Sequence, residues 1–73
     1  MPSYGPFADA PFDPEHLQAM ASAFEIVSRD FGLEPCDITL RKWVASAVIE
    51  CAHRGIRDRI EIRKCATKIL RLN

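Results

Sequence analysis

The side chains in this chain that could bind a metal or act as nucleophiles include three cysteines and two histidines: Cys36, Cys51, Cys65, His16 and His53. The cysteines lie 15 and 14 positions apart, without the CxxC spacing typical of zinc or redox motifs. Because their number is odd, any intramolecular disulfide leaves one thiol over. Cys51 and Cys65 fall on the apolar faces of expected helices, where we interpret them as small hydrophobic residues. We therefore predict no metal site and no cofactor.

The two histidines do not form part of a recognisable acid-base or metal-binding arrangement. His16 lies in the first turn of the first expected helix and His53 near the end of the second, and we expect both to face solvent. The sequence contains no glycine-rich phosphate loop, nucleophile elbow or clustered carboxylate pair. A chain of 73 residues also offers little volume for a substrate pocket. We predict that the protein is not an enzyme and has no small-molecule substrate.

Charge is segregated along the chain, although its ten acidic and ten basic residues cancel. Residues 1–40 carry seven carboxylates and one cation, whereas residues 41–73 carry three carboxylates and nine cations. This asymmetry indicates either a basic surface for an anionic partner or two halves that pair within one chain or between copies. The candidate basic surface consists of Arg54, Arg57, Arg59, Arg63, Lys64, Lys68 and Arg71.

A basic helix that follows a tight glycine turn is also a feature of helix-turn-helix DNA-binding proteins. The detailed pattern disfavours this interpretation, because positions that should be buried between the two helices are charged, for example Glu50 and Arg54. Asp58 and Glu61 would also face phosphate at the start of the basic helix. The zero net charge removes the long-range attraction on which non-specific DNA binding depends. A small DNA-binding regulator that uses the basic third helix is therefore the alternative function, with nucleic acid a disfavoured partner.

The composition is that of a folded domain, with 48% apolar and 27% charged residues. The longest apolar or small stretch, Trp43 to Ile49, is far below the roughly 20 residues that cross a bilayer. The start of the chain has neither the basic residues nor the apolar run of a secretory signal, so we expect a cytoplasmic protein. The basic third helix also has the general form of a membrane-surface helix. We disfavour a membrane partner because its apolar face is needed for a core.

The first twelve residues predict an extended, flexible arm, because three prolines and a glycine oppose a regular helix. Its aromatic residues indicate that the arm can also lie along the body or on another copy. Asp13 and Pro14 then have the types preferred at a helix N-cap and first helical position. Apolar residues follow at helical spacing until Gly32 terminates the helix: Leu17, Met20, Ala21, Phe24, Val27 and Phe31.

Two further helices are predicted after Pro35. The second is capped by Asp37 or Thr39 and carries the most regular apolar stripe of the chain: Leu40, Trp43, Val44, Ala47, Val48, Cys51 and Ala52. The side chains in the middle of this helix are small, which should let a neighbouring helix approach closely. The third follows Gly55, with Asp58 and Glu61 in a capping-box pattern. Its stripe consists of Ile62, Cys65, Ala66, Ile69 and Leu70.

Two short motifs carry a resemblance to known sequences. These are FDPE at Phe12 to Glu15, which opens a helix ending near Gly32, and RGIRD at Arg54 to Asp58, which precedes a short helix. With these motifs, residues 12–72 resemble a group of small, uncharacterised bacterial three-helix proteins. The resemblance implies a small helical domain and no particular activity.

The sequence thus predicts an all-α protein, a small three-helix bundle over residues 13–73 preceded by the flexible arm of residues 1–12. The chain has more apolar surface than three short helices can bury. The excess defines a candidate apolar interface of Phe7, Phe12, Ile26, Trp43 and Ile49. We expect Trp43 to anchor the core, with its indole edge at an interface. The predicted function is a non-catalytic protein-interaction module that self-associates, with a homodimer as the expected form.

Overall fold

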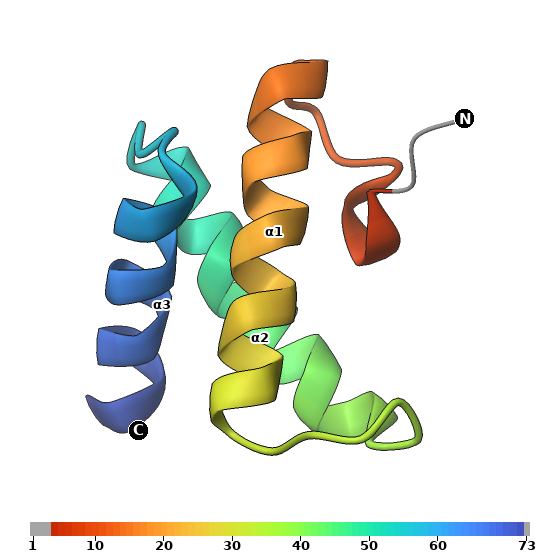
Figure 1. Ribbon diagram of the computed structural model, residues 1–73. Coiled ribbons are helices and arrows are strands. Elements are labelled where there is room, and N and C mark those ends of the chain that lie inside the picture. Colours follow the sequence, from red (N-terminus) through yellow and green to blue (C-terminus); the bar gives the residue numbers. More distant parts are fainter. Residues whose placement is uncertain (1–3, 73) are drawn as a thin grey trace.

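Three α-helices form the fold: α1 (Pro14–Asp30), α2 (Ile38–His53) and α3 (Arg59–Leu72). A short 3-10 helix, η1 (Gly5–Phe7), precedes them (Figure 1). The computed structural model describes residues 4–72, and no strand occurs in that range. Each helix contacts the other two, and η1 packs on α1 and α2. The predicted all-α, three-helix architecture is confirmed.

Helix α1 begins and ends at the residues that the sequence indicates. The Asp13 carboxylate accepts a hydrogen bond from the backbone N–H of His16 at 2.9 Å, and Pro14 occupies the first helical position. At the other end Gly32 adopts a φ of +68°, a conformation that favours glycine. The Leu33 N–H then donates to the carbonyl oxygen of Ser28 at 2.9 Å, which satisfies one of the last helical acceptors.

The boundaries of the other two helices follow the same local rules. Asp37 precedes α2, but its carboxylate accepts from the Glu34 N–H at 2.8 Å and organises the connector instead of capping the helix. Gly55 turns the chain after α2 with a φ of +89°. Asp58 then caps α3, because its carboxylate accepts from the Glu61 N–H at 3.2 Å.

The core is built from the predicted helical stripes and contains many small side chains. All three helices contribute buried alanines: Ala23, Ala45, Ala47, Ala52 and Ala66. Larger buried residues fill the space between them: Leu17, Met20, Phe24, Val27, Val44, Val48, Ile62 and Leu70. Small facing residues let helix axes approach closely, so the interior depends on a few large side chains for its volume.

The start of α2 departs from the predicted stripe. Leu40 and Trp43 were expected in the core, but they are 44% and 41% exposed. The first turn of α2 has no helix over it, since Ile38 and Thr39 are exposed as well. Trp43 lies at the border of the buried arc, which is centred on Val44 and Val48. The prediction that Trp43 anchors the core is therefore wrong.

Residues 4–12 do not form the predicted extended arm, because they include η1 and pack several side chains against the helices. Phe7 is fully buried, and its ring meets that of Phe24 edge to face, with ring centroids 5.6 Å apart. Phe7 therefore belongs to the core, and its assignment to an exposed interface is wrong. Tyr4 and Phe12 pack partly against the same core. The part of the predicted arm at residues 1–3 lies outside the described residues.

A disulfide between Cys51 of α2 and Cys65 of α3 cross-links two helices, with the Cα atoms 6.1 Å apart. The interpretation of these cysteines as free hydrophobic residues is therefore wrong. Both lie on apolar faces, and these faces meet where α2 packs on α3. A cross-link that closes a loop of this length contributes about 3 kcal/mol to stability. The thiol left over is Cys36, which is free and exposed.

The burial of Phe7 generates a prediction about stability. Phe7→Ala should lower the free energy of unfolding by about 3–5 kcal/mol, because it empties a site that no helix can refill. Urea denaturation of the oxidised protein, followed by circular dichroism, measures this change. Ile60→Ala is the matched control, since Ile60 is 40% exposed and should change stability by less than about 1 kcal/mol. Equal losses in the two variants would contradict the assignment of Phe7 to the core.

Candidate functional site

The candidate basic surface divides into two groups according to the partners of its residues. The first group is neutralised by carboxylates of the same chain. Arg57 contacts Asp13, the N-cap of α1, at 2.6 Å. Arg63 contacts Asp30, the last residue of α1, at 3.1 Å. Arg54 contacts Glu50 at 3.1 Å, one turn earlier on α2.

These ion pairs show where the acidic and basic halves of the sequence meet. In addition to the two pairs that reach α3 and its preceding turn, Arg41 of α2 contacts Glu25 of α1 at 3.5 Å. The Arg41 guanidinium also lies over the Phe24 ring, 4.8 Å from its centroid. Carboxylates of residues 1–40 therefore pair with cations of residues 41–73 within one chain.

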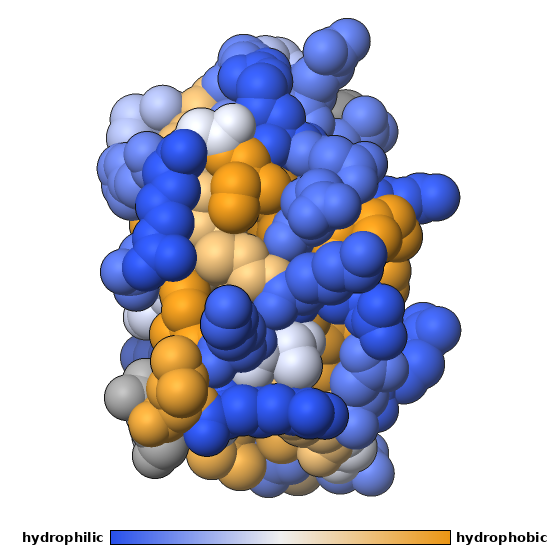
Figure 2. All heavy atoms as spheres, turned by 90° about the vertical axis from the view of Figure 1, so that its left-hand side faces the viewer, coloured by the Kyte–Doolittle hydropathy of each residue, from blue (hydrophilic) through white to orange (hydrophobic). Residues whose placement is uncertain are grey.

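The second group of cations remains without such partners. Arg59, Lys64, Lys68 and Arg71 make no ion pair with any residue in the range 4–72. Lys64, Lys68 and Arg71 follow one another at helical spacing on the outer side of α3. With Arg63, Thr67 and Leu72 they line a shallow hollow of about 360 Å³. Figure 2 shows this side of the molecule, where long hydrophilic side chains lie across apolar ones.

The turn between α2 and α3 is attached to the start of α1 by two polar contacts. The first is the ion pair of Arg57 with Asp13. The second joins His16 Nε2 to the carbonyl oxygen of Ile56 at 2.8 Å, and because a carbonyl can only accept, Nε2 carries the proton. His16 is 5% exposed, so the prediction that it faces solvent is wrong. His53 is exposed, as expected, and its ring lies 5.2 Å from that of Phe12.

The contacts of Asp13 alter its acidity. The hydrogen bond from the Arg57 guanidinium lowers the pKa of Asp13 below its ordinary value of 3.8, and the hydrogen bond from the His16 N–H acts in the same direction. Both contacts favour the ionised carboxylate. Asp13 therefore combines two roles, the cap of α1 and the partner of the α2–α3 turn.

The members of the candidate apolar interface do not form one surface. Phe7 is buried, and Phe12, Ile26 and Ile49 are half-buried. Ile49 packs against the core, and since it lies six positions after Trp43 the two occupy different faces of α2. Only Trp43 among these residues is exposed.

Sequence reasoning missed the exposed neighbour of Trp43. Leu40 lies three positions earlier and therefore on an adjoining part of the same helix surface. We call Leu40 and Trp43 the α2 apolar patch. Trp43 also borders a hollow of about 150 Å³ between α2 and α3, whose walls include Ala47, Ile69 and Leu70.

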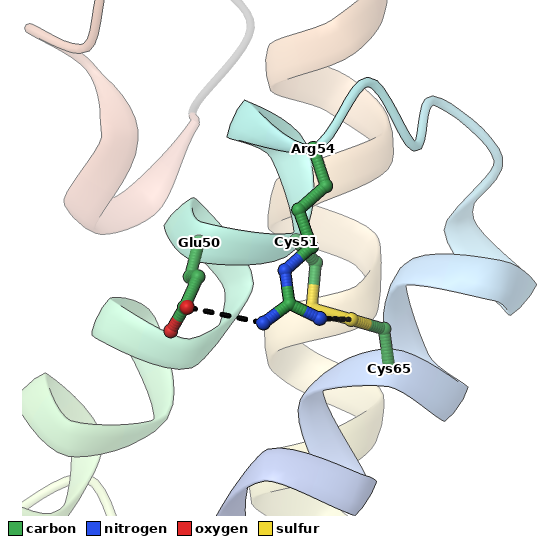
Figure 3. A network of polar contacts seen from close by, with 4 residues as sticks. All are labelled: Glu50, Cys51, Arg54 and Cys65. Atoms are coloured by element: carbon green, nitrogen blue, oxygen red, sulfur yellow. Dashed lines mark hydrogen bonds and ion pairs between the residues drawn. A yellow bond between two sulfur atoms is a disulfide. The ribbon is translucent and has the colours of Figure 1, made fainter.

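The same helix pair carries a polar cluster around the disulfide (Figure 3). One guanidinium nitrogen of Arg54 donates to Glu50, and the other lies 3.9 Å from Cys65 Sγ. Cys51 is fully buried, whereas Cys65 is half-buried. The two sulfur atoms of one bridge therefore have different surroundings.

No family model, curated protein or solved structure matches this chain. The resemblance to small bacterial three-helix proteins stays a prediction. No helix in the described part of the chain has both the length and the hydropathy needed to cross a membrane. Residues 4–72 contain no group of three or more His, Cys, Asp or Glu side chains arranged to hold a metal ion.

The lowered pKa of Asp13 predicts a pH-dependent contribution to stability. A carboxylate whose pKa is depressed by folding stabilises the folded state above its unfolded pKa, and this contribution is lost as the pH falls through its folded pKa. Asp13→Asn keeps a capping side chain but removes the charge. We expect the variant to be less stable than the wild type at neutral pH, and the difference to shrink below about pH 4.

Thermal unfolding as a function of pH measures this difference. Asp9→Asn is the matched control, because Asp9 precedes the same helix and makes no ion pair with a described residue. The control should follow the wild type at every pH. A stability difference for Asp13→Asn that persists unchanged in acid would contradict a role for the Asp13 charge.

Proposed function

We propose that this domain is a non-catalytic interaction module that binds a second copy of itself through the α2 apolar patch. The observation that carries the proposal is the exposure of Leu40 and Trp43, at 44% and 41%, next to the α2 residues that enter the core. Tryptophan is enriched at the centres of protein interfaces, because it buries a large area with few rotatable bonds. A partner that covers Trp43 would complete the burial of this side of α2.

The residues around Trp43 support a second copy as the partner. Lys42, Ser46 and Glu50 succeed one another every fourth position on the outer side of α2. In an antiparallel pair of α2 helices centred on Ser46, Lys42 of each copy would lie opposite Glu50 of the other. Such an arrangement is self-complementary, as a two-fold interface requires.

The side chains along this line are suited to a close helix pair. Ser46 is small and exposed, so two α2 helices could approach each other at their centre. Lys42 makes no ion pair with residues 4–72, and only one carboxylate oxygen of Glu50, Oε1, contacts Arg54. Exposed ion pairs contribute about 0–1 kcal/mol each, so Lys42 and Glu50 would orient the interface while the apolar patch supplies affinity.

Size-exclusion chromatography with light scattering tests the proposal. The wild type should elute as a dimer at high protein concentration, and salt should loosen it only modestly. Trp43→Glu should weaken association by about tenfold or more, because it places a charge at the centre of the interface. Ile60→Glu is the matched control, since Ile60 has nearly the same exposure, 40%, but lies at the start of α3. A wild type that remains monomeric at high concentration would reject self-association.

A DNA-binding regulator is the second candidate function, and the cations of α3 that form no ion pair within residues 4–72 favour it. Lys64, Lys68 and Arg71 lie side by side on an exposed helix surface and could contact phosphates. Against this function, three members of the basic surface are already neutralised by carboxylates of the same chain. The net charge of zero gives no general attraction to DNA.

A gel shift with generic duplex DNA separates the two functions. The interaction module should not retard the duplex at physiological salt. If Lys64, Lys68 and Arg71 each neutralised one phosphate, retardation would occur, and the logarithm of the binding constant would fall with the logarithm of salt concentration with a slope of about −2.7. Retardation with this slope, abolished by Lys64→Glu with Lys68→Glu, would replace self-association as the function of the exposed surface.

A further inference from the structure

The two cysteines joined by the Cys51–Cys65 disulfide differ in exposure. Cys51 is fully buried on α2, whereas Cys65 is half-buried at the outer seam between α2 and α3. A thiol or disulfide from solution can therefore reach Cys65 more readily than Cys51. Such a difference in access decides which sulfur of a bridge exchanges first.

Arg54 adds a positive charge at the accessible sulfur. Its Nη1 lies 3.9 Å from Cys65 Sγ, and its Nη2 donates to Glu50 Oε1 at 3.1 Å (Figure 3). Glu50 offsets part of the charge, but it also fixes the guanidinium in place beside the sulfur. A cation in this position stabilises a thiolate, which is the nucleophilic form of cysteine. Reactive cysteines of reversible redox pairs combine accessibility, a nearby cation and a second cysteine within reach.

We propose that Cys65 is a reactive thiol and Cys51 its resolving thiol, forming a reversible bridge that exchanges with low-molecular-weight disulfides and thiols. In the reduced protein the Cys65 thiolate attacks one sulfur of a disulfide R–S–S–R. A Cys65–S–S–R bond forms, the R–S–S–R bond breaks, and one R–S⁻ leaves. Cys51 then loses its proton to solvent and attacks Cys65 Sγ. The Cys51–Cys65 bond forms as the second R–S⁻ leaves.

The exchange balances without a cofactor. Two protein thiols are oxidised by two electrons, and one R–S–S–R is reduced to two R–S–H once the leaving thiolates take up protons. In the reverse direction a solution thiolate attacks Cys65 Sγ, and the Cys51 thiolate leaves. The proposal is independent of self-association, because it concerns atoms of a single chain.

Oxidised glutathione is the probe for the reaction, and Cys36→Ser is the background that removes the exposed third thiol. Reduced protein is mixed with the probe, and mass spectrometry follows the adducts. With Cys51→Ser added, Cys65 should accumulate a stable mixed disulfide, because no resolving thiol remains. With Cys65→Ser added instead, Cys51 should react at least about tenfold more slowly, because it is buried. Equal rates at the two cysteines would overturn the assignment of Cys65 as the reactive thiol.

Arg54 is tested in the Cys36→Ser, Cys51→Ser background. Arg54→Ala should slow adduct formation at Cys65 by about fivefold, the effect of one charge at this distance in an exposed site. Arg54→Lys should restore most of the rate. Arg71→Ala is the matched control, because it removes the same charge elsewhere on α3 and should leave the rate unchanged. An unchanged rate in Arg54→Ala, or an equal decrease in the control, would overturn the role of Arg54.

The wild-type chain supplies a test that does not depend on the folding of any variant. Millimolar reduced glutathione should open the bridge in the native protein, and oxidised glutathione should close it again, with helical circular dichroism retained throughout. A bridge that opens only after denaturation would be purely structural and would overturn the proposal.

Discussion

The close approach of three helices through small side chains is the constraint on which the rest of the structure depends. Alanines on every helix face the interior, so the backbones can lie near one another, but these residues fill little volume. A few larger side chains must complete the core, and one of them, Phe7, comes from outside the three helices. A proline-rich segment that cannot form a long helix is thereby held in place by the buried ring of Phe7, together with the partly buried Tyr4 and Phe12.

The same proximity lets the oppositely charged parts of this neutral chain form ion pairs with each other. Carboxylates in or beside α1 come within reach of arginines from the rest of the chain, and three of them pair there: Asp13, Glu25 and Asp30. Each exposed pair contributes little energy by itself. Together they neutralise the arginines that face α1, whereas Lys64, Lys68 and Arg71, which pair with no carboxylate of residues 4–72, lie on the outer side of α3.

Most features encoded by neighbouring residues could be predicted from the sequence, whereas features that depend on a distant element could not. The cap predicted for α2 is the local exception, because the Asp37 carboxylate accepts from the Glu34 N–H and makes no cap hydrogen bond. The Asp13 and Asp58 caps and the turns at Gly32 and Gly55 follow from residue types a few positions apart, and all four are present. The exposure of Trp43 depends on which arc of α2 the neighbouring helices cover, which the apolar periodicity within α2 does not reveal. The burial of His16 likewise depends on a carbonyl forty positions away, and the disulfide depends on which helix faces meet.

At the seam between α2 and α3, helix α2 carries the apolar patch, part of the core and one cysteine of the disulfide. The row Trp43, Ala47, Glu50 and Arg54 runs along α2 from the apolar patch to the disulfide, and Glu50 borders both the Trp43 hollow and the Arg54 guanidinium. A domain of this size has a stability of only about 5 kcal/mol, of which a bridge worth about 3 kcal/mol is a large share. The bridge therefore helps to hold α2 against α3 at the seam that Trp43 borders.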